Sequence, residues 1–148
     1  MRLRQAISTW LTAALQRWRR DDSTGARGEN VAAKYLETQR YRVLGRNVRN
    51  QVGEIDILAQ APDGRTIVVV EVKARLVEHP PGDDLIPELH VDQRKQRKLT
   101  MLAAALAKQR QWAQRPIRFD VIGVDLPPVR SSTEPVIRHH EAAFESHV

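Results

Sequence analysis

Two carboxylates and an ammonium group stand at a spacing in this sequence that suits metal-dependent chemistry. Asp56 is followed, after fourteen intervening residues, by Glu71-Val72-Lys73. Side chains two residues apart on a strand share a face, so Glu71 and Lys73 should point the same way, and Asp56 can join them from a neighbouring strand. Ionised carboxylates that lie close together repel each other, and a hard divalent cation offsets that repulsion by taking their oxygens as ligands. The pattern therefore predicts a site for Mg²⁺ or Mn²⁺.

The lysine suggests what such a site does. A cation beside the metal can orient an attacking water, lower its pKa, or stabilise negative charge on a pentacoordinate phosphate. These are the requirements of phosphodiester hydrolysis. A simple salt bridge between Lys73 and either acid is the alternative interpretation, because acid-x-lysine triplets on strands are common by chance.

Glu29 is a third acid in an unusual position. It lies in line with Ala32 and Leu36, which follow three and seven residues later on the apolar face of an expected helix. A carboxylate placed there is costly unless it is paired or bound to a metal. Stabilisation of a first-turn acid by the helix dipole is the alternative.

The elements that must position these residues follow from turn signals and hydrophobic periodicity. The hairpin turn is expected at Pro62-Asp63-Gly64, and the β-branched run after it predicts a central strand, covered on both faces. The expected elements are a helix over 25–39, strands over 41–49, 54–59 and 66–73, a helix over 88–110, a strand over 117–124 and a short edge strand over 136–140.

The second long helix carries a cluster of basic residues at 94–98. Its buried face is marked by Leu99, Leu102 and Leu106. Lys95 precedes Leu99 by one turn on the same face, so it should emerge near the sheet, whereas Arg94 and Arg97 should point elsewhere. Local basicity favours a polyanionic partner such as nucleic acid, because phosphate neutralisation supplies most non-specific affinity. A solvated helix face is the alternative.

Composition indicates one soluble globular domain. The chain has 148 residues, 41% hydrophobic and 28% charged, and no cysteine, which excludes disulfides and thiolate metal sites. A cytoplasmic location is expected. The net charge is +6, of which residues 1–20 carry +5 from five arginines with no acid, so the remaining 19 basic and 18 acidic residues nearly balance.

Residues 1–20 predict a basic amphipathic helix with two tryptophans. Their apolar residues recur at three- and four-residue spacing, without the long apolar run of a membrane span or the cleavage site of a signal peptide. Contact with an anionic membrane surface or a partner protein, and packing on the chain's own domain, are both open.

An ordered series of motifs resembles the YraN-like family of small uncharacterised endonuclease-like proteins. The series is Gly25-x-x-Gly28-Glu29-x-x-Ala32-x-x-Tyr35-Leu36, Asn47, Gly53-Glu54-Ile55-Asp56, Val70-Glu71-Val72-Lys73-x-Arg75, Lys95-x-x-Lys98-Leu99, Arg118-Phe119-Asp120-Val121 and residues 137–144. It covers roughly residues 24–145, so the N-terminal segment lies outside it.

The resemblance implies a restriction-endonuclease-like core of the PD-(D/E)xK superfamily, similar to archaeal Holliday-junction resolvases. It implies Asp56 and Glu71 as metal ligands, Lys73 as the catalytic lysine and Glu29 as an additional catalytic acid and ligand. Glu54, on the strand face of Asp56, is a candidate for supporting the metal site. Ile55 stands where the superfamily pattern has proline, a position that tolerates variation.

The predicted fold is therefore α/β: a central mixed sheet flanked by helices in the order α-β-β-β-α-β, preceded by the N-terminal helix. We divide the chain into a basic amphipathic helix (1–22), a nuclease-like core (23–126) and a C-terminal segment (127–148) of loop, short strand and helical end.

The predicted function is a metal-dependent endonuclease that acts on DNA, in branched or structured form by analogy, and leaves 5′-phosphate and 3′-hydroxyl ends. Nucleic-acid contacts are expected from Arg75, Arg94, Lys95 and Lys98. A homodimer is expected by the same analogy, and no small-molecule cofactor. The alternative is a non-catalytic nucleic-acid-binding or adaptor protein that retains the fold.

Overall fold

The computed structural model describes residues 23–78 and 90–146, and the predicted helix over 1–22 lies outside them. Within these ranges two helices and five strands follow one another in the order that the sequence predicts, and the fifth strand is the one predicted over 136–140. They are α2 (Thr24–Thr38), β1 (Arg42–Arg49), β2 (Glu54–Gln60), β3 (Ile67–Leu76), α3 (Gln93–Gln109), β4 (Ile117–Leu126) and β5 (Val136–Phe144).

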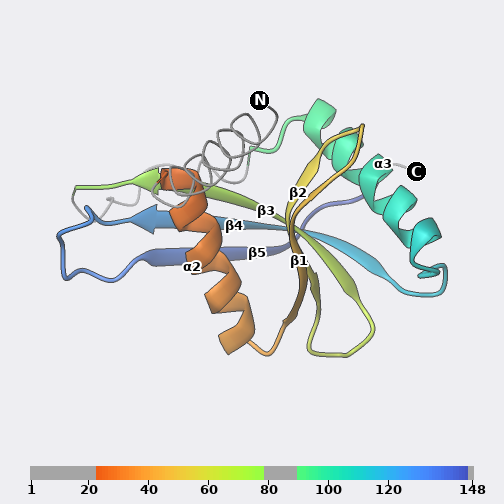
Figure 1. Cartoon of the computed structure of the whole chain (residues 1–148), viewed down its shortest axis with the longest axis horizontal. Helices are drawn as coiled ribbons and strands as arrows, with labels where there is room; N and C mark the ends of the chain where they lie inside the picture. Colours follow the sequence, from red (N-terminus) through yellow and green to blue (C-terminus); the bar gives the residue numbers. More distant parts are fainter. Residues whose placement is uncertain (1–22, 79–89, 147–148) are drawn as a thin grey trace, which may run out of the picture.

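The strands form one mixed sheet in the order β1-β2-β3-β4-β5 (Figure 1). β3 and β4 are parallel and connected through α3, whereas the other neighbouring pairs are antiparallel. This arrangement confirms the predicted α/β class with a mixed sheet flanked by helices. It also confirms that the aliphatic run forms the central strand, since β3 is third of the five described strands.

The two helices cover opposite faces of the sheet. Val68 and Val70 of β3 belong to the apolar cluster that includes α2, while Ile67 and Val69 belong to the cluster that includes α3. Alternate residues of a strand point to opposite faces, so the four-residue aliphatic run over 67–70 contributes to both layers. Glu71 is the next residue on the α3 face, where the apolar cluster ends.

The N-terminal half of α2 approaches β3 closely because residue 28 has no side chain. A Cβ atom added to Gly28 would lie 2.2 Å from Cβ of Ala74, well inside van der Waals contact. This approach brings the first turns of α2, including Glu29, against the sheet beside β2 and β3.

Gly28→Ala is expected to destabilise the fold by about 1–3 kcal/mol, the usual cost of overpacking a core. Alanine stabilises a helix by about 1 kcal/mol relative to glycine. Helix propensity therefore cannot explain a loss of stability in urea denaturation, and such a loss would report the clash. Gly25→Ala is the matched control, since nothing lies within 4 Å of a Cβ added there. Ala74→Gly in the Gly28→Ala background should restore part of the loss; equal stability of Gly28→Ala and wild type would contradict this packing.

The C-terminal segment differs from the prediction of a short strand followed by a helical end. β5 extends from Val136 to Phe144, and residues 127–146 contain no helix. The strand continues because its last residue stacks on Phe119 of β4, with ring centroids 4.9 Å apart. A two-residue register shift, with Ala142 at a φ of 49°, lets the ladder resume beyond the irregularity.

Neither helix of the described ranges is long and apolar enough to cross a membrane.

Candidate active site

The register of the β2–β3 hairpin places Asp56 opposite Glu71. The paired residues run from Gln60↔Ile67 to Ile57↔Val70, and the next position in the same register brings these two acids together. Backbone pairing stops there, because Oδ2 of Asp56 accepts a hydrogen bond from the Val72 backbone N–H at 2.8 Å. The Asp56 carboxylate thus accepts a hydrogen bond from the backbone of β3 at the point where the two strands separate.

Glu71 is a buried acid with one satisfied oxygen. Its side chain is 4% exposed, and Oε1 pairs with the ammonium group of Lys95 from α3. Oε2 is buried without a hydrogen-bond partner in the residues that the structure describes. An orphaned carboxylate oxygen beside a second carboxylate is an arrangement that a divalent cation would complete.

The pair of acids is electrostatically strained. Burial raises the pKa of the Glu71 carboxyl to about 7, and the neighbouring charge of Asp56 adds to the rise, although Lys95 opposes it. Burial also raises the pKa of Asp56, against the hydrogen bond from Val72 and the charge of Lys95. A single ammonium group therefore does not compensate the two carboxylates.

The raised pKa of Glu71 predicts how stability depends on pH in the presence of EDTA. An acid whose pKa is higher in the folded state than its unfolded value of 4.5 binds more protons when folded, so stability falls as pH rises from about 4.5 to about 7. Above pH 7 the cost is about 2–3 kcal/mol. Glu71→Gln should remove this cost, giving a variant that is more stable than wild type at pH 8 and equally stable at pH 4, measured by urea denaturation. A Glu71→Gln variant that is destabilised at pH 8 would contradict this account.

Two further acids face the same region from α2 and β2. Glu29 lies 4.0 Å from the guanidinium of Arg46, and burial raises its pKa, with the charge of Asp56 adding to the rise. With its nitrogen turned toward the carboxylates, the Asn47 amide donates to Glu29 Oε2 (3.2 Å) and Glu54 Oε1 (2.8 Å). Asn47 has a φ of 49°, a left-handed conformation that asparagine tolerates better than most residues.

No role for Asn47 follows from the sequence alone. The available signal was an asparagine in the middle of an otherwise β-forming and basic segment, where asparagine is unfavourable. Its contribution depends on a contact with Glu29, eighteen residues earlier in the chain, which only the folded chain brings within reach.

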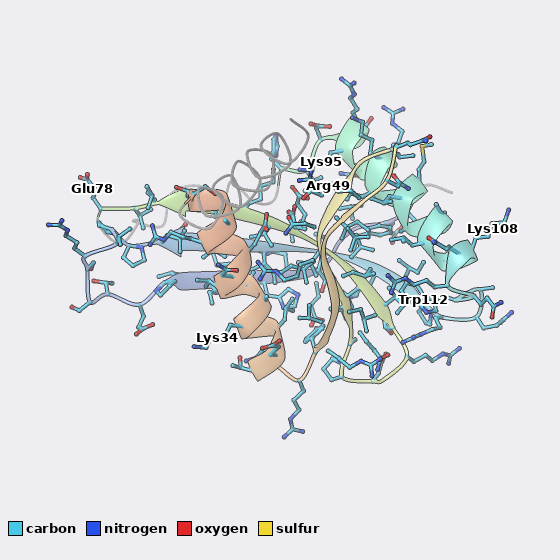
Figure 2. The ribbon with its side chains drawn as sticks, viewed as in Figure 1. Lys34, Arg49, Glu78, Lys95, Lys108 and Trp112 are labelled. Atoms are coloured by element: carbon cyan, nitrogen blue, oxygen red, sulfur yellow. The ribbon has the colours of Figure 1, made fainter. Side chains whose placement is uncertain are left out.

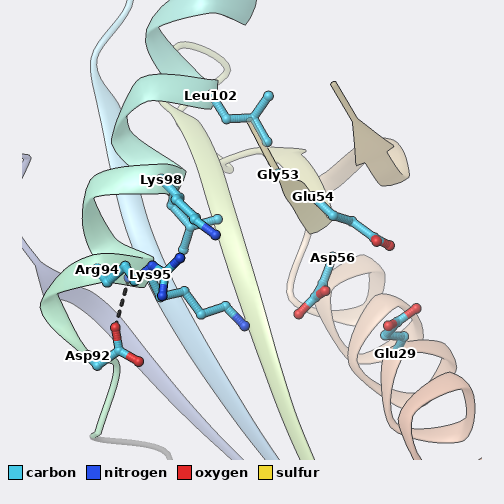
Figure 3. A pocket seen from close by; sticks show the side chains of 10 residues that line it. Glu29, Gly53, Glu54, Asp56, Asp92, Arg94, Lys95, Lys98 and Leu102 are labelled. Carbon is cyan, nitrogen blue, oxygen red and sulfur yellow. Dashed lines mark hydrogen bonds between the residues drawn. The ribbon is translucent and has the colours of Figure 1, made fainter. Parts of the chain in front are cut away.

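A cleft of about 610 Å³ separates the acids from a basic helix end (Figure 3). Glu29, Glu54 and Asp56 stand on one side, and side chains of α3 reach in from the other. The lining residues are Glu29, Gly53, Glu54, Asp56, Asp92, Arg94, Lys95, Lys98, Leu99 and Leu102. The cleft therefore presents three acids on one side and three bases, together with Asp92, on the other.

The residues predicted to bind nucleic acid are divided by the structure. Lys95 and Lys98 line the cleft. Arg94 lines it too, although helix periodicity predicted that Arg94 would point elsewhere. The prediction was wrong because periodicity says nothing about what lies beside a helix N-terminus. Arg75 instead pairs with the buried Asp125, at 2.7 Å from Nε to Oδ1. Figure 2 shows Lys95 at the cleft end of α3 and Lys108 at the other end.

Lys73 is not among the residues that line the cleft. Its side chain is half-buried, and its ammonium group donates to the backbone carbonyl of His90 at 3.3 Å. It shares a strand face with Glu71, as the spacing predicts, yet the lysine that pairs with Glu71 is Lys95.

The acids fit a magnesium ion as a two-carboxylate site. Within residues 23–78 and 90–146 no three acidic or histidine side chains are grouped tightly enough to hold a metal by themselves. Mg²⁺ usually keeps several waters and binds proteins through one or two carboxylates together with substrate phosphates. Asp56 and Glu71 supply that pair, and Glu29 and Glu54 line the same cleft as Asp56.

Comparison with known proteins places the chain among relatives from several bacteria. The model of "Uncharacterised protein family UPF0102" matches residues 28–124. A UPF0102 protein of Geobacter metallireducens is 45% identical over 124 residues, 83% of this chain and 93% of the relative. Those of Geobacter sulfurreducens (40%; 82% and 88% covered) and Thermodesulfovibrio yellowstonii (39%; 81% and 94% covered) are also similar.

Proposed function

The chain belongs to the uncharacterised protein family UPF0102, the YraN family, and we propose that its acidic cleft hydrolyses DNA phosphodiester bonds with a bound Mg²⁺ or Mn²⁺ ion. The family membership confirms the resemblance that the motifs predict. The activity itself is our proposal, and so is membership of the restriction-endonuclease-like superfamily.

The observation that carries the proposal is the pair formed by Asp56 and Glu71. Two acids are brought together at the point where the β2–β3 ladder opens, and one of them keeps a buried oxygen that has no partner among residues 23–78 and 90–146. Burying two adjacent carboxylates costs stability, as the raised pKa values of both indicate. Proteins retain such strained groups mostly at functional sites, where a ligand or metal repays the cost.

The basic wall supports a polyanionic substrate. Arg94, Lys95 and Lys98 lie across the cleft from the acids, at the N-terminal end of α3. A phosphodiester backbone that enters the cleft would meet these cations and would bring its scissile phosphate in front of Asp56 and Glu71. Phosphate contacts of this kind position a backbone without reading its sequence.

In the proposed reaction, Asp56 and Glu71 would hold the metal, and Glu29 and Glu54, which share the Asn47 amide as a donor, would accept hydrogen bonds from water in the cleft. When bound, the metal would act as a Lewis acid on the phosphate and favour ionisation of the attacking water. The water oxygen bonds to phosphorus, the bond from phosphorus to the 3′ oxygen breaks, and the 3′ oxygen takes up a proton. The products carry 5′-phosphate and 3′-hydroxyl ends.

Cleavage of supercoiled plasmid, linear duplex and a four-way junction with Mg²⁺, Mn²⁺ or EDTA tests the proposal. We expect nicking that requires the divalent cation, and a preference for the junction would support the analogy with resolvases. The full chain should be used, because residues 1–22 carry much of the positive charge. Absence of metal-dependent cleavage on all three substrates would overturn the activity.

A second candidate function, nucleic-acid binding without cleavage, is favoured by the position of Lys73. Its ammonium group is held by a backbone carbonyl outside the cleft lining instead of pairing with Glu71. Binding that weakens steeply with salt, is indifferent to EDTA and leaves the DNA intact would support this function. The homodimer and the membrane or partner contact of residues 1–20 stay predictions.

A further inference from the structure

We propose that Lys95 is the exchangeable cation of the cleft: it neutralises Glu71 while no metal is bound, leaves Glu71 when a divalent cation arrives, and then contacts the phosphate to be cleaved. This inference rests on the proposed function. It assigns to a helix residue the part that the sequence pattern gives to Lys73.

The position of Lys95 is determined by the start of α3. Asp92 caps the helix and accepts the Lys95 backbone N–H at 2.9 Å, as Figure 3 shows. One turn later Leu99 is buried in the apolar cluster on the sheet. These two contacts orient the side chain toward the sheet, and its ammonium group pairs with Glu71, a buried residue that is not part of the cleft lining.

The ion pair between Lys95 and Glu71 joins unequal partners. The Glu71 side chain is 4% exposed and fixed in β3, whereas the Lys95 side chain is 45% exposed on a flexible stem. If one partner moves, it is therefore the lysine. Lysine heads can turn into water at small cost while their aliphatic stems stay in place.

Repulsion between cations favours the exchange, because Lys95 contacts Oε1 of the same carboxylate whose Oε2 is the candidate metal ligand. Asp56 and Glu71 together carry two negative charges when ionised, and an ammonium group compensates only one of them. A divalent cation compensates both, and it would approach the same Glu71 carboxylate that Lys95 contacts. Two cations on the two oxygens of one carboxylate repel each other. Metal binding at Oε2 is therefore expected to weaken the pairing of Lys95 with Oε1 and to release the ammonium group.

The displaced ammonium group remains on the basic wall of the cleft. Arg94 and Lys98 flank it on the same wall, so the open side of the cleft attracts a phosphate. A lysine at this place can stabilise the additional negative charge that develops on the phosphate during hydrolysis. Lys73, by comparison, is held by the His90 carbonyl at 3.3 Å.

The test is Mn²⁺ binding, followed by electron paramagnetic resonance of the free ion, in the wild type and in Lys95→Met, Lys95→Arg and Lys98→Met. Lys95→Met removes the competing cation and should tighten Mn²⁺ binding by at least about fivefold. Lys95→Arg keeps a cation on Glu71 and should bind Mn²⁺ like the wild type. Lys98→Met is the matched control for the loss of one positive charge. Lys98 lines the same cleft but has no carboxylate partner in the described part of the chain. We therefore expect its Mn²⁺ affinity to change by less than about twofold.

Cleavage at saturating Mn²⁺ completes the test. Lys95→Met should lose about a hundredfold in rate despite its tighter metal binding, because the phosphate has lost its cation. Unchanged or weaker Mn²⁺ binding by Lys95→Met, or tighter binding with undiminished cleavage, would overturn the inference. Failure of the proposed function has a different signature: wild type that binds no Mn²⁺, or Asp56→Asn that binds it as tightly as wild type.

Discussion

Asp56→Asn is expected to abolish divalent-cation binding and to reduce the cleavage rate by more than about a hundredfold. Mutation of residues that only hydrogen-bond to metal ligands already lowers metal affinity or activity by about 10- to 100-fold. The substitution removes the charge and keeps an oxygen that can accept the Val72 N–H, so the strand junction should stay intact. Loss of activity would then report loss of the metal ligand. Plasmid nicking rates and Mn²⁺ titration measure the two effects.

Asp63→Asn provides the matched control for this substitution. Asp63 makes the same kind of side-chain contact, accepting the backbone N–H groups of Arg65 and Thr66 at 2.8 Å, but it lies in the exposed turn between β2 and β3. Its variant should cleave like the wild type. If Asp56→Asn also cleaved at the wild-type rate, hydrolysis at this site would be ruled out.

Asp120→Ala is expected to cause the largest loss of stability, about 3–5 kcal/mol, because it breaks a buried charge pair and removes the acceptor that three donors share. The Asp120 side chain is fully buried and accepts from Arg118, His139 and the Ala142 backbone N–H. Burial alone would raise its pKa, but the hydrogen bonds from His139 and Arg118 lower it, so the carboxylate stays ionised. Urea denaturation at pH 7 measures the loss.

A double-mutant cycle with Arg118→Met separates the pair from the packing around it. Arg118 also donates to the Tyr41 hydroxyl at 2.8 Å, so its removal alone should be costly. In the Asp120→Ala background, Arg118→Met should cause a much smaller loss of stability, since the main partner of Arg118 is already absent. Mn²⁺ binding should be unchanged, because none of these residues lines the cleft. A loss below about 1 kcal/mol in Asp120→Ala would contradict the assigned role.

Local sequence pattern was sufficient to predict the helices and strands. The Pro62-Asp63-Gly64 turn, the aliphatic run of β3 and the helical periodicities lie in contiguous segments, and most boundaries were predicted within three residues. The long helix begins at Gln93 rather than near residue 88 because Asp92 caps it there. The length of β5 was missed because it depends on contacts with β4, in particular the Ala142 N–H bound by Asp120.

The amino-acid sequence by itself determined which acids can meet. The spacing of Asp56 and Glu71 around a two-stranded hairpin places them opposite each other, because register follows from the turn between them. Only the tertiary structure decided which cation joins them. Lys73 is two residues from Glu71, but its ammonium group reaches the His90 carbonyl, while Lys95 arrives from the helix that crosses between β3 and β4. Helix spacing predicts that Lys95 emerges near the sheet, but its pairing with Glu71 depends on how α3 packs on the sheet, which spacing does not determine.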